Sequence, residues 1–403
     1  MKAYWVFASV LLVTVLSTAG IALPYPILAP LFMGDQANEL NQFMAISPEL
    51  LLGFSLAIYP LGIFIGGSFI GALSDTYGRK KLLVYTLIIS VLGYFLTAYA
   101  ITSEDYLLFI FARLVTGLCE GNLSIARAIA LDLAEKIDKT RAMSLIAAAS
   151  FLGWLVGPLA GGYLAQYGAE VAFQVAGIAV LLCLFFVMLV ITETHRVIQN
   201  QSFLFLLKSN NSLVLLKQPT ILSIFIFQFI FCLGLNAFYE FYPVWLLVER
   251  GYESSMIGET TAIMTFSMML ASVLVVTKLK RFFGLLPTII TALICSALLL
   301  GILPLFSGTS MVVLFALTGV TIAIYNGLLP VYTSEVNRHV GNGALMGLLT
   351  VTFCIANAVM AIFGSLVLTI SIAFPMYLGA ILIGLSSLLV IKFAYRKPVV
   401  SVK

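Results

Sequence analysis

Three ionisable residues, Arg113, Glu120 and Arg127, lie seven residues apart inside one long apolar run. Seven α-helical residues turn through about 700°, roughly 20° short of two full turns, so the spacing predicts all three on one helix face. Gly117 and Ser124 fall on the same face. Because charged groups in an apolar segment are costly, this row is the first place to expect chemistry.

The chemistry that this row suits is proton exchange, with Glu120 as the proton carrier. An apolar cavity disfavours the charged form of a carboxyl group and a neighbouring guanidinium favours it, so the arrival of a second molecule can expel the proton. Arg113 and Arg127 also suit the recognition of carboxylates. Two structural alternatives remain: an ion network that only holds helices together, and an Arg127 side chain that extends to the nearby interface.

Asn236 and Glu240 form a second candidate pair in another apolar run. At a spacing of four residues they face the same way on a helix. Glu240 lies toward the end of its run, shortly before Pro243. It is therefore either a second proton carrier or a carboxylate at the boundary between apolar surroundings and water.

The composition decides the class of protein. Of 403 residues, 62% are hydrophobic and 9% are charged, and the mean hydropathy is +1.11. A soluble domain carries about 25% charged residues, so a soluble enzyme or a nucleic-acid-binding protein is excluded. The net charge of +4 indicates no polyanionic partner. At about 20 residues for each spanning helix, the length accommodates about a dozen spans.

Apolar runs separated by polar clusters predict an all-α polytopic membrane protein with twelve spans. The spans lie near residues 4–30, 49–72, 82–101, 106–132, 142–165, 170–192, 219–248, 255–277, 286–306, 310–333, 344–371 and 373–394. We expect two pseudo-symmetric six-helix bundles, residues 1–192 and 219–403, joined by a cytoplasmic loop, residues 193–218. The loop contains an amphipathic stretch, residues 201–208, that suits the membrane surface.

Lysine and arginine collect on one side of these spans. With a cytoplasmic N-terminus, the cytoplasmic segments hold 18 of the 21 basic residues and six acidic residues, a net charge of +12. The outer loops hold one basic and nine acidic residues, a net charge of −8. The positive-inside rule therefore predicts that both termini are cytoplasmic.

The five cysteines all lie in apolar runs without CxxC spacing, and both histidines lie among polar loop residues. This pattern predicts buried free thiols, with no disulfide framework, metal site or cofactor. The sequence lacks HExxH and the phosphate-binding GxxxxGK[ST] loop, so we expect neither an enzyme nor direct use of ATP. The apolar N-terminal stretch is too long for a signal-peptide core and is predicted to remain as the first span.

A sharp motif lies between the second and third predicted spans, Gly71-Ala-Leu-Ser-Asp75-Thr-Tyr-Gly78-Arg79-Lys80-Lys81. Gly71 permits close helix packing, Gly78 permits a tight turn, and Asp75 suits the N-terminus of a helix. A basic membrane anchor after a turn is the plainer interpretation. The string resembles the GxLxDxxGRKK loop of the major facilitator superfamily at every defining position.

The resemblance implies that Asp75 and Arg79 form a latch between the two halves in one state of alternating access. In the second half, the basic loop 278–284 occupies the corresponding position, but Arg281 stands where Asp75 would be. Thr116-Gly117 and Thr318-Gly319 give a further, weak sign of an internal repeat.

Two more motifs resemble the proton-driven exporters of this superfamily. Arg113-Leu-Val-Thr-Gly117 is similar to the RxxxG signature of the fourth span, and the fifth span is similar to the GxxxGPxxGG element. That element comprises Gly153, Gly157, Pro158, Gly161 and Gly162. On physical grounds it forms a flat glycine face with a proline kink, which packing alone would also explain. Pro24-Tyr-Pro26-Ile-Leu-Ala-Pro30 resembles the proline-rich end of the first span in drug:proton antiporters, without the acidic residue that some members carry there.

The resemblance also places several side chains in spans that line the central cavity of family members. They are Tyr25, Tyr59, Trp154, Tyr239, Tyr325, Asn326 and Asn357. Each also suits ordinary packing or hydrogen bonding between helices. Together with 30 phenylalanines and 13 methionines, they suit an amphipathic organic substrate better than a small ion or a sugar.

The sequence thus favours a proton-coupled exporter of a small organic molecule, with two bundles that rock around a midplane site. The substrate is either a drug-like amphiphile or a carboxylate metabolite such as a siderophore. An importer, symporter or facilitator is the alternative, and a non-transporting receptor or scaffold is disfavoured because no loop exceeds about 26 residues. We expect a monomer in the lipid bilayer of a bacterial inner membrane, with protons and a small molecule as its partners and no nucleic acid.

Overall fold

The computed structural model of the chain describes residues 2–34, 38–120, 122–132, 139–192, 212–337, 340 and 342–396. These residues contain helices and turns and no strand. Within them, eleven helices are long and apolar enough to cross a membrane, and Tyr106–Cys119 is a shorter apolar helix. The prediction of an all-α polytopic membrane protein with about twelve spans is confirmed.

Contacts divide the chain into two compact units. Unit 1 contains Met1–Asn210 and Leu246–Ala262, and unit 2 contains Asn211–Trp245 and Ile263–Lys403. The first boundary falls inside the connection predicted from the sequence, residues 193–218. The boundaries of the two six-helix bundles stay a prediction, because unit 1 also includes the short stretch Leu246–Ala262.

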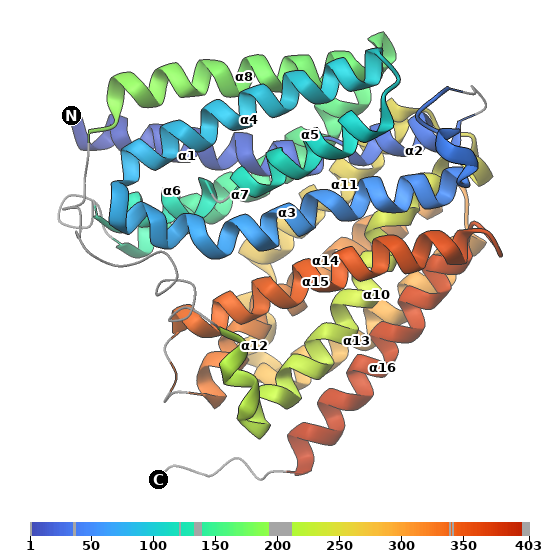
Figure 1. Cartoon of the computed structure of the whole chain (residues 1–403). Helices are drawn as coiled ribbons and strands as arrows, with labels where there is room; N and C mark the ends of the chain where they lie inside the picture. Colours follow the sequence, from blue (N-terminus) through green and yellow to red (C-terminus); the bar gives the residue numbers. More distant parts are fainter. Residues whose placement is uncertain are drawn as a thin grey trace. The chain divides into compact units, whose positions relative to one another are not determined.

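The helices of unit 1 pack in pairs. They are α1 (Lys2–Ala22), α2 (Tyr25–Met33), α3 (Pro48–Tyr77), α4 (Arg79–Thr102), α5 (Tyr106–Cys119), α6 (Asn122–Asp132), α7 (Lys139–Leu164) and α8 (Ala169–Val190). Helix α1 packs against α7, α3 against α5, and α4 against α8 (Figure 1). The pairing brings segments from distant parts of the sequence to one another, which is how the polar residues of the site meet.

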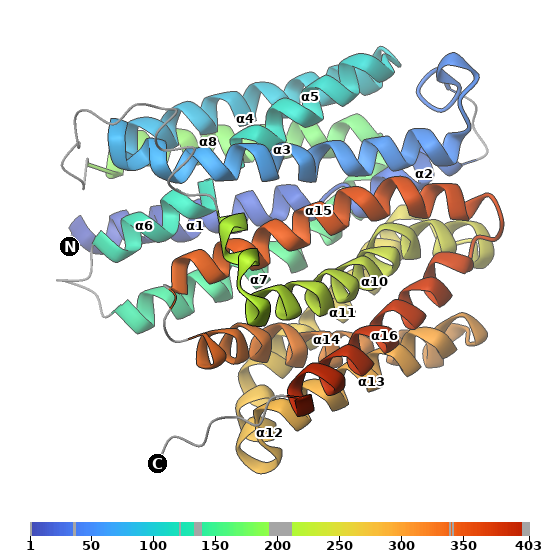
Figure 2. The ribbon, with the colours of Figure 1, turned by 60° about the horizontal axis from the view of Figure 1, so that its bottom comes forward.

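Unit 2 is formed by the later helices, two of which, α10 and α11, continue into Leu246–Ala262. They are α10 (Pro219–Arg250), α11 (Ser254–Leu274), α12 (Val276–Phe283), α13 (Leu285–Ile302), α14 (Gly308–Val336), α15 (Asn342–Leu368) and α16 (Phe374–Arg396). Helix α13 packs against both α14 and α16 (Figure 2). Short 3₁₀ turns occur at Phe43–Ala45, Ala165–Tyr167, Ser212–Lys217 and Leu303–Leu305.

Two predicted spans are interrupted. The first divides into α1 and α2 around Pro24, which has no N–H for a helical hydrogen bond. The fourth divides after Cys119: the N–H of Glu120 donates to the carbonyl of Gly117 at 3.1 Å, and α6 begins at Asn122. The expected continuous helix is therefore described as two helices, and because the side chain of Arg127 lies outside the described residues, the common face of Arg113, Glu120 and Arg127 stays a prediction.

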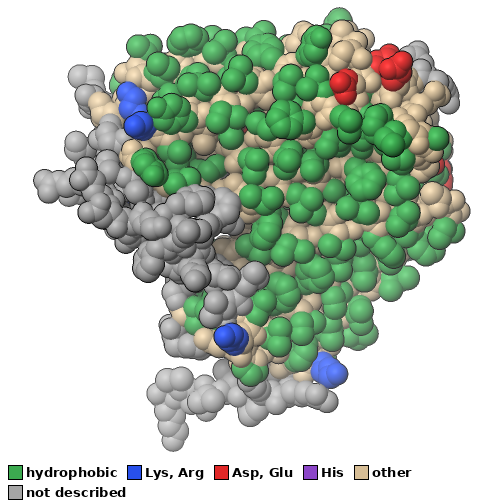
Figure 3. Space-filling view, in the orientation of Figure 1, with side chains coloured by type: hydrophobic (Ala, Val, Ile, Leu, Met, Phe, Trp, Pro, Cys, Tyr) green, Lys and Arg blue, Asp and Glu red, His purple; other side chains and the backbone are tan. Residues whose placement is uncertain are grey.

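Large apolar side chains face outward along the helices, as a lipid-facing surface requires. Leu92, Leu182 and Leu189 are exposed by 62%, 65% and 84%. Figure 3 shows hydrophobic side chains over most of the visible described surface. By contrast, Glu120, Glu240 and Arg113 are buried. Polar groups therefore gather inside the helical units, where they have a function or a structural partner.

Two glycines with positive φ support the internal repeat. Gly78 (φ 100°) joins α3 to α4, and Gly284 (φ 85°) joins α12 to α13. Side chains rarely adopt these backbone angles. Each glycine lies in a basic loop at the corresponding position of its half, so the two loops form similar turns.

Candidate functional site

The carboxyl group of Glu120 lies where four helices of unit 1 meet. It follows the last residue of α5 and is 6% exposed. It interacts with Ser17 of α1, Tyr59 of α3 and Tyr94 of α4 through their hydroxyl groups, and electrostatically with Arg113 of α5. An acidic group and a basic group therefore share one buried polar cluster.

Arg113 is held by aromatic rings. Its Cζ lies 4.0 Å from the ring centroid of Tyr59 and 5.8 Å from that of Phe173. A cation over an aromatic face is attracted by the ring quadrupole, and more strongly away from water. The rings thus offset part of the cost of burying a guanidinium that is only 3% exposed.

The cluster has unused hydrogen-bonding capacity. Nε and Nη1 of Arg113, the hydroxyl oxygens of Tyr59 and Tyr94, and Oε2 of Glu120 form no hydrogen bond of regular geometry. Buried polar groups are usually satisfied, and unsatisfied ones cost about 1–3 kcal/mol each. Such a site gains from taking up a proton or a polar ligand.

Close packing of α3 and α5 positions Tyr59 and Arg113. A Cβ atom at Gly117 would lie 3.2 Å from the Cα of Gly62, and one at Gly62 would lie 2.9 Å from the Cα of Gly117. Helices without side chains at the contact approach closely. Gly20 of α1 similarly leaves room for the Tyr94 hydroxyl, which a Cβ would overlap. The glycine of the Arg113-xxx-Gly117 motif thus places the arginine beside Tyr59.

The glycine face expected on α7 packs against α1. A Cβ at Gly157 would lie 3.1 Å from the Cα of Ala19, and one at Gly153 or Gly161 would overlap the carbonyl of Val15 or Leu23. The other side of α7 contacts the start of α11 within unit 1. There a Cβ at Gly162 would overlap the carbonyl of Ser254, and one at Gly258 would lie 2.5 Å from the carbonyl oxygen of Pro158.

A second buried cluster lies in unit 2. Asn357 of α15 donates through Nδ2 to Oδ1 of Asn236 at 2.8 Å and to Oε1 of Glu240, both on α10. Asn236 donates through its own Nδ2 to the carbonyl of Cys232 at 2.8 Å. The predicted common face of Asn236 and Glu240 is confirmed, and α15 supplies their partner.

The remaining cavity candidates lie in less polar surroundings. The rings of Tyr25 and Trp154 pack with their centroids 6.0 Å apart. The hydroxyl of Tyr325 donates to Oε1 of Gln228 at 2.7 Å, so this side chain has a structural partner. Tyr239 contacts the sulfur of Met268, and Asn326 is exposed.

The predicted latch is described in part. Helix α3, which includes Gly71, runs to Tyr77, Gly78 makes the turn, and Arg79 begins α4 with 8% exposure. The side chains of Asp75 and Arg127, and the amphipathic stretch 201–208, lie outside the described residues. In the second half, Nζ of Lys280 pairs with Glu335 at 3.3 Å.

Ser17 and Tyr94 were not predicted as site residues. Each is one of several polar side chains in a mostly apolar span, a pattern that packing explains equally well. Only the meeting of α1 and α4 with α5 reveals their relation to Glu120. No local signal identifies them.

These observations describe a membrane protein with buried ionisable clusters on glycine-packed helices. The family model for the Major Facilitator Superfamily matches residues 10–360. The chain belongs to the Major Facilitator Superfamily. Members of this superfamily are transporters and not enzymes, so the chain is a secondary transporter.

Relatives of this superfamily member include named efflux and resistance proteins. The chain is 24% identical over 339 residues to the Multidrug resistance protein 2 of Bacillus subtilis (strain 168). The match covers 82% of this chain and 84% of the relative. The chain is 30% identical over 188 residues to the class H Tetracycline resistance protein of Pasteurella multocida, covering 46% of this chain and 44% of that relative.

A solved structure supports the fold over nearly the full length. The human organic anion transporter MFSD10 superposes with a TM-score of 0.69 at 19% identity, covering 96% of this chain and 99% of that one. At this identity the likeness shows the major facilitator fold alone.

Proposed function

We propose that this superfamily member is a proton-coupled exporter of a small organic molecule, with Glu120 as the proton carrier. The observation that carries the proposal is the buried carboxyl of Glu120, which lies in a cluster with unused hydrogen-bonding groups that also contains Arg113. The glycine face of α7 and the names of the two bacterial relatives favour export over import.

The cluster supplies a physical basis for coupling. When Glu120 is ionised, it attracts the Arg113 guanidinium, and when it takes up a proton, that attraction is lost. A polar substrate group that contacts Arg113 or the Tyr59 hydroxyl changes which state is favoured. Proton binding and substrate binding are thereby linked through groups that already lie together. By thermodynamic linkage, the proton changes the affinity for the substrate by the same factor as the substrate changes the affinity for the proton.

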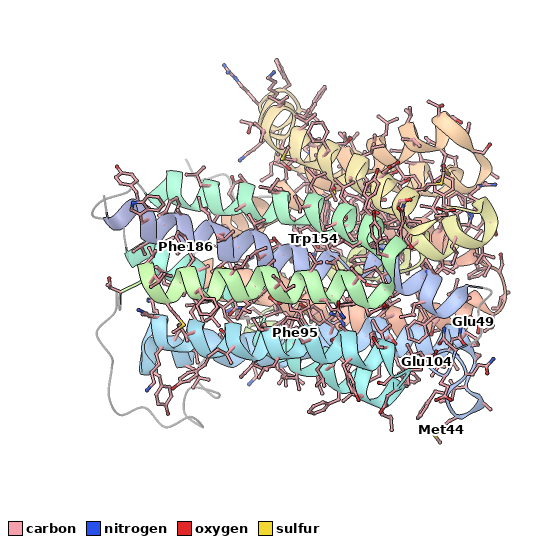
Figure 4. All side chains as sticks on the ribbon, turned by 90° about the horizontal axis from the view of Figure 1, so that it is seen from above. Met44, Glu49, Phe95, Glu104, Trp154 and Phe186 are labelled. Atoms are coloured by element: carbon pink, nitrogen blue, oxygen red, sulfur yellow. The ribbon has the colours of Figure 1, made fainter. Side chains whose placement is uncertain are left out.

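The proposed orientation has both termini in the cytoplasm of a bacterial inner membrane, with the protein as a monomer. The separation of charges in unit 1 supports the orientation. Figure 3 shows basic side chains at one end of the visible helices of unit 1 and acidic ones at the other. Figure 4 places Glu49 and Glu104 at one end of unit 1 and Phe186 toward the opposite end. Basic groups prefer the cytoplasmic side.

Inverted membrane vesicles with an acidic lumen test the proposal. Cationic amphiphiles and polycarboxylates are added in turn while a pH-sensitive dye reports the lumen. Protein-dependent alkalinisation identifies proton antiport and the substrate that drives it. Uptake of a metabolite by whole cells, without any response in vesicles, would favour an importer.

The variant Glu120→Gln tests whether Glu120 is the proton carrier. It keeps the size of the side chain but removes the exchangeable carboxyl proton, so we expect folded protein in which substrate flux no longer moves protons. Glu335→Gln is the matched control, because it removes a half-exposed carboxylate that pairs with Lys280. Wild-type proton movement in Glu120→Gln vesicles would refute the assignment.

A further inference from the structure

Helix α12 has one apolar side and one basic side. At about 100° for each residue, its four apolar side chains fall within an arc of about 120°, and its three basic side chains lie on the opposite side. The apolar residues are Val276, Leu279, Phe282 and Phe283, and the basic residues are Lys278, Lys280 and Arg281. This division is typical of a helix that lies where apolar surroundings meet water.

The first turn of α12 packs within unit 2. Val276 is 8% exposed, and a Cβ at Gly327 of α14 would lie 3.3 Å from its Cγ1. The hydroxyl of Thr288, on α13, donates to the carbonyl of Leu279 at 3.3 Å. Helix α12 therefore has a defined place against α13 and α14, at an edge of the unit (Figure 2).

The last turn of α12 carries two uncovered aromatic rings. Phe282 and Phe283 are exposed by 78% and 67%. Because α12 connects two membrane-length helices, Ser254–Leu274 and Leu285–Leu305, these rings lie at the level where the membrane ends. An exposed apolar pair at this level suits insertion among lipid chains.

Two of the basic side chains lie next to this pair and have no acidic partner. Nζ of Lys280 pairs with Oε1 of Glu335 at 3.3 Å. Among the residues that the structure describes, Lys278 and Arg281 form no ion pair, and both side chains are exposed. At a spacing of three residues they are neighbours on the helix surface. Two adjacent cations suit a ligand with a phosphate group.

The corresponding loop of the first half carries its charges differently. With Gly284 aligned on Gly78, Arg281 stands in place of Asp75, and the basic residues precede the glycine instead of following it. An acidic residue can interact with the N-terminus of a neighbouring helix, whereas a basic residue there would be repelled. The basic residues of α12 therefore need a different, negatively charged partner.

We propose that α12 binds an anionic phospholipid. Lys278 and Arg281 contact the phosphate of the headgroup, and Phe282 and Phe283 lie among the acyl chains. Each basic residue at a membrane surface favours anionic over neutral lipid by about fivefold. A second copy of the chain suits this surface less well, because a symmetric contact would bring the same basic residues together. The inference does not depend on the substrate or on the direction of transport.

Lipid binding to the intact chain, purified in detergent micelles, tests this surface without a transport assay. Phosphatidylglycerol is the anionic probe, and phosphatidylcholine with the same acyl chains is the zwitterionic control. Native mass spectrometry counts the lipid molecules that the protein retains over a titration. We expect wild-type protein to bind phosphatidylglycerol at least tenfold more tightly than phosphatidylcholine.

Substitutions separate the basic residues from the aromatic pair. Lys278→Gln combined with Arg281→Gln should reduce the preference for phosphatidylglycerol to within twofold. Phe282→Ala combined with Phe283→Ala should weaken the binding of both lipids. Lys217→Gln is the matched control, because it removes an exposed basic residue just before α10, and it should leave the preference within twofold of wild type. Thermal unfolding shows whether each variant is intact.

Four results would overturn the lipid site. An unchanged preference in the variant without Lys278 and Arg281 is the first, and an equal loss in Lys217→Gln, which would indicate a general response to charge, is the second. Displacement of phosphatidylglycerol by millimolar inorganic phosphate at constant ionic strength would assign the basic pair to a free anion. A wild-type dimer that the double phenylalanine variant dissociates would assign the aromatic pair to a second copy of the chain.

Discussion

The guanidinium of Arg113 lies over the ring of Tyr59, with its Cζ 4.0 Å from the ring centroid. The two residues come from adjacent helices, α3 and α5, which meet at Gly62 and Gly117. Arg113 therefore has a fixed position although two of its nitrogens have no regular hydrogen bond. The ring holds the charge in place while leaving its donors available to Glu120 or to a ligand.

Substitutions at Tyr59 separate the ring from the hydroxyl. Tyr59→Phe keeps the aromatic face, so Arg113 should stay in place and transport should fall only modestly. Tyr59→Leu removes a desolvated cation–π contact of about 2 kcal/mol, which corresponds to a loss of about thirtyfold in the coupled rate. Initial rates of proton movement in the vesicle assay measure both. Equal losses in the two variants would show that the hydroxyl, and not the ring, is what matters.

The α1–α7 contact should be sensitive to a single methyl group. A Cβ at Gly157 would lie 3.1 Å from the Cα of Ala19 and 2.5 Å from its carbonyl oxygen. The backbone of Ala19 cannot move aside as easily as a flexible side chain can. We therefore expect Gly157→Ala to destabilise the protein by about 1–3 kcal/mol, the usual cost of overpacking. Gly67→Ala on α3 is the control, because nothing lies within 4 Å of its Cβ. Thermal unfolding in detergent compares the two, and an unaltered midpoint for Gly157→Ala would contradict the packing.

Much of the fold is predictable because spanning helices have a strong sequence signal. Membrane-length apolar runs and basic loops locate the helices to within a few residues in most cases, for example 170–192 against Ala169–Val190. The break after Cys119 is missed because the run stays apolar on both sides of Glu120 and Gly121. Pro24 is a visible signal, yet prolines also occur inside continuous helices, as Pro60 does in α3.

The site is less predictable than the fold. Arg113, Glu120 and Glu240 can be identified from the sequence as ionisable residues in apolar spans. A charge there is energetically costly, so it indicates a functional or structural role. The spacing of Asn236 and Glu240 predicts their common face, but it does not predict that Asn357, 117 residues from Glu240, joins them. Tyr94 and Ser17 approach Glu120 only through tertiary packing, which no local pattern encodes.

The turn at Gly284 should resist substitution for backbone reasons alone. Its φ of 85° is unfavourable for other residues, whereas the nearest atom to an added Cβ, Cδ of Pro287, is at an ordinary 3.8 Å. We expect Gly284→Ala to cost about 1–3 kcal/mol. Gly301→Ala in α13 makes an ordinary contact of 3.6 Å with Ala380 and should be neutral or slightly stabilising. Thermal unfolding midpoints test this, and equal midpoints would argue against a strained turn.

A hydrogen bond between α4 and α6 should position the segment that follows Glu120. Thr86 Oγ1 lies 2.5 Å from Oδ1 of Asn122, the first residue of α6, and both side chains are buried. Thr86→Val keeps the shape but removes the donor. Hydrogen bonds between membrane helices average about 0.6 kcal/mol and reach about 1.7 kcal/mol, so the stability loss should be small.

The larger effect of Thr86→Val is expected on transport. Helix α6 begins two residues after Glu120, so a shift of its start should also shift the carboxyl. We expect the proton-coupled rate to fall by at least fivefold while the unfolding midpoint changes by only a few degrees. Thr86→Ser retains the hydroxyl and should restore most of the rate. If Thr86→Val kept the wild-type rate, the position of Glu120 would not depend on this hydrogen bond.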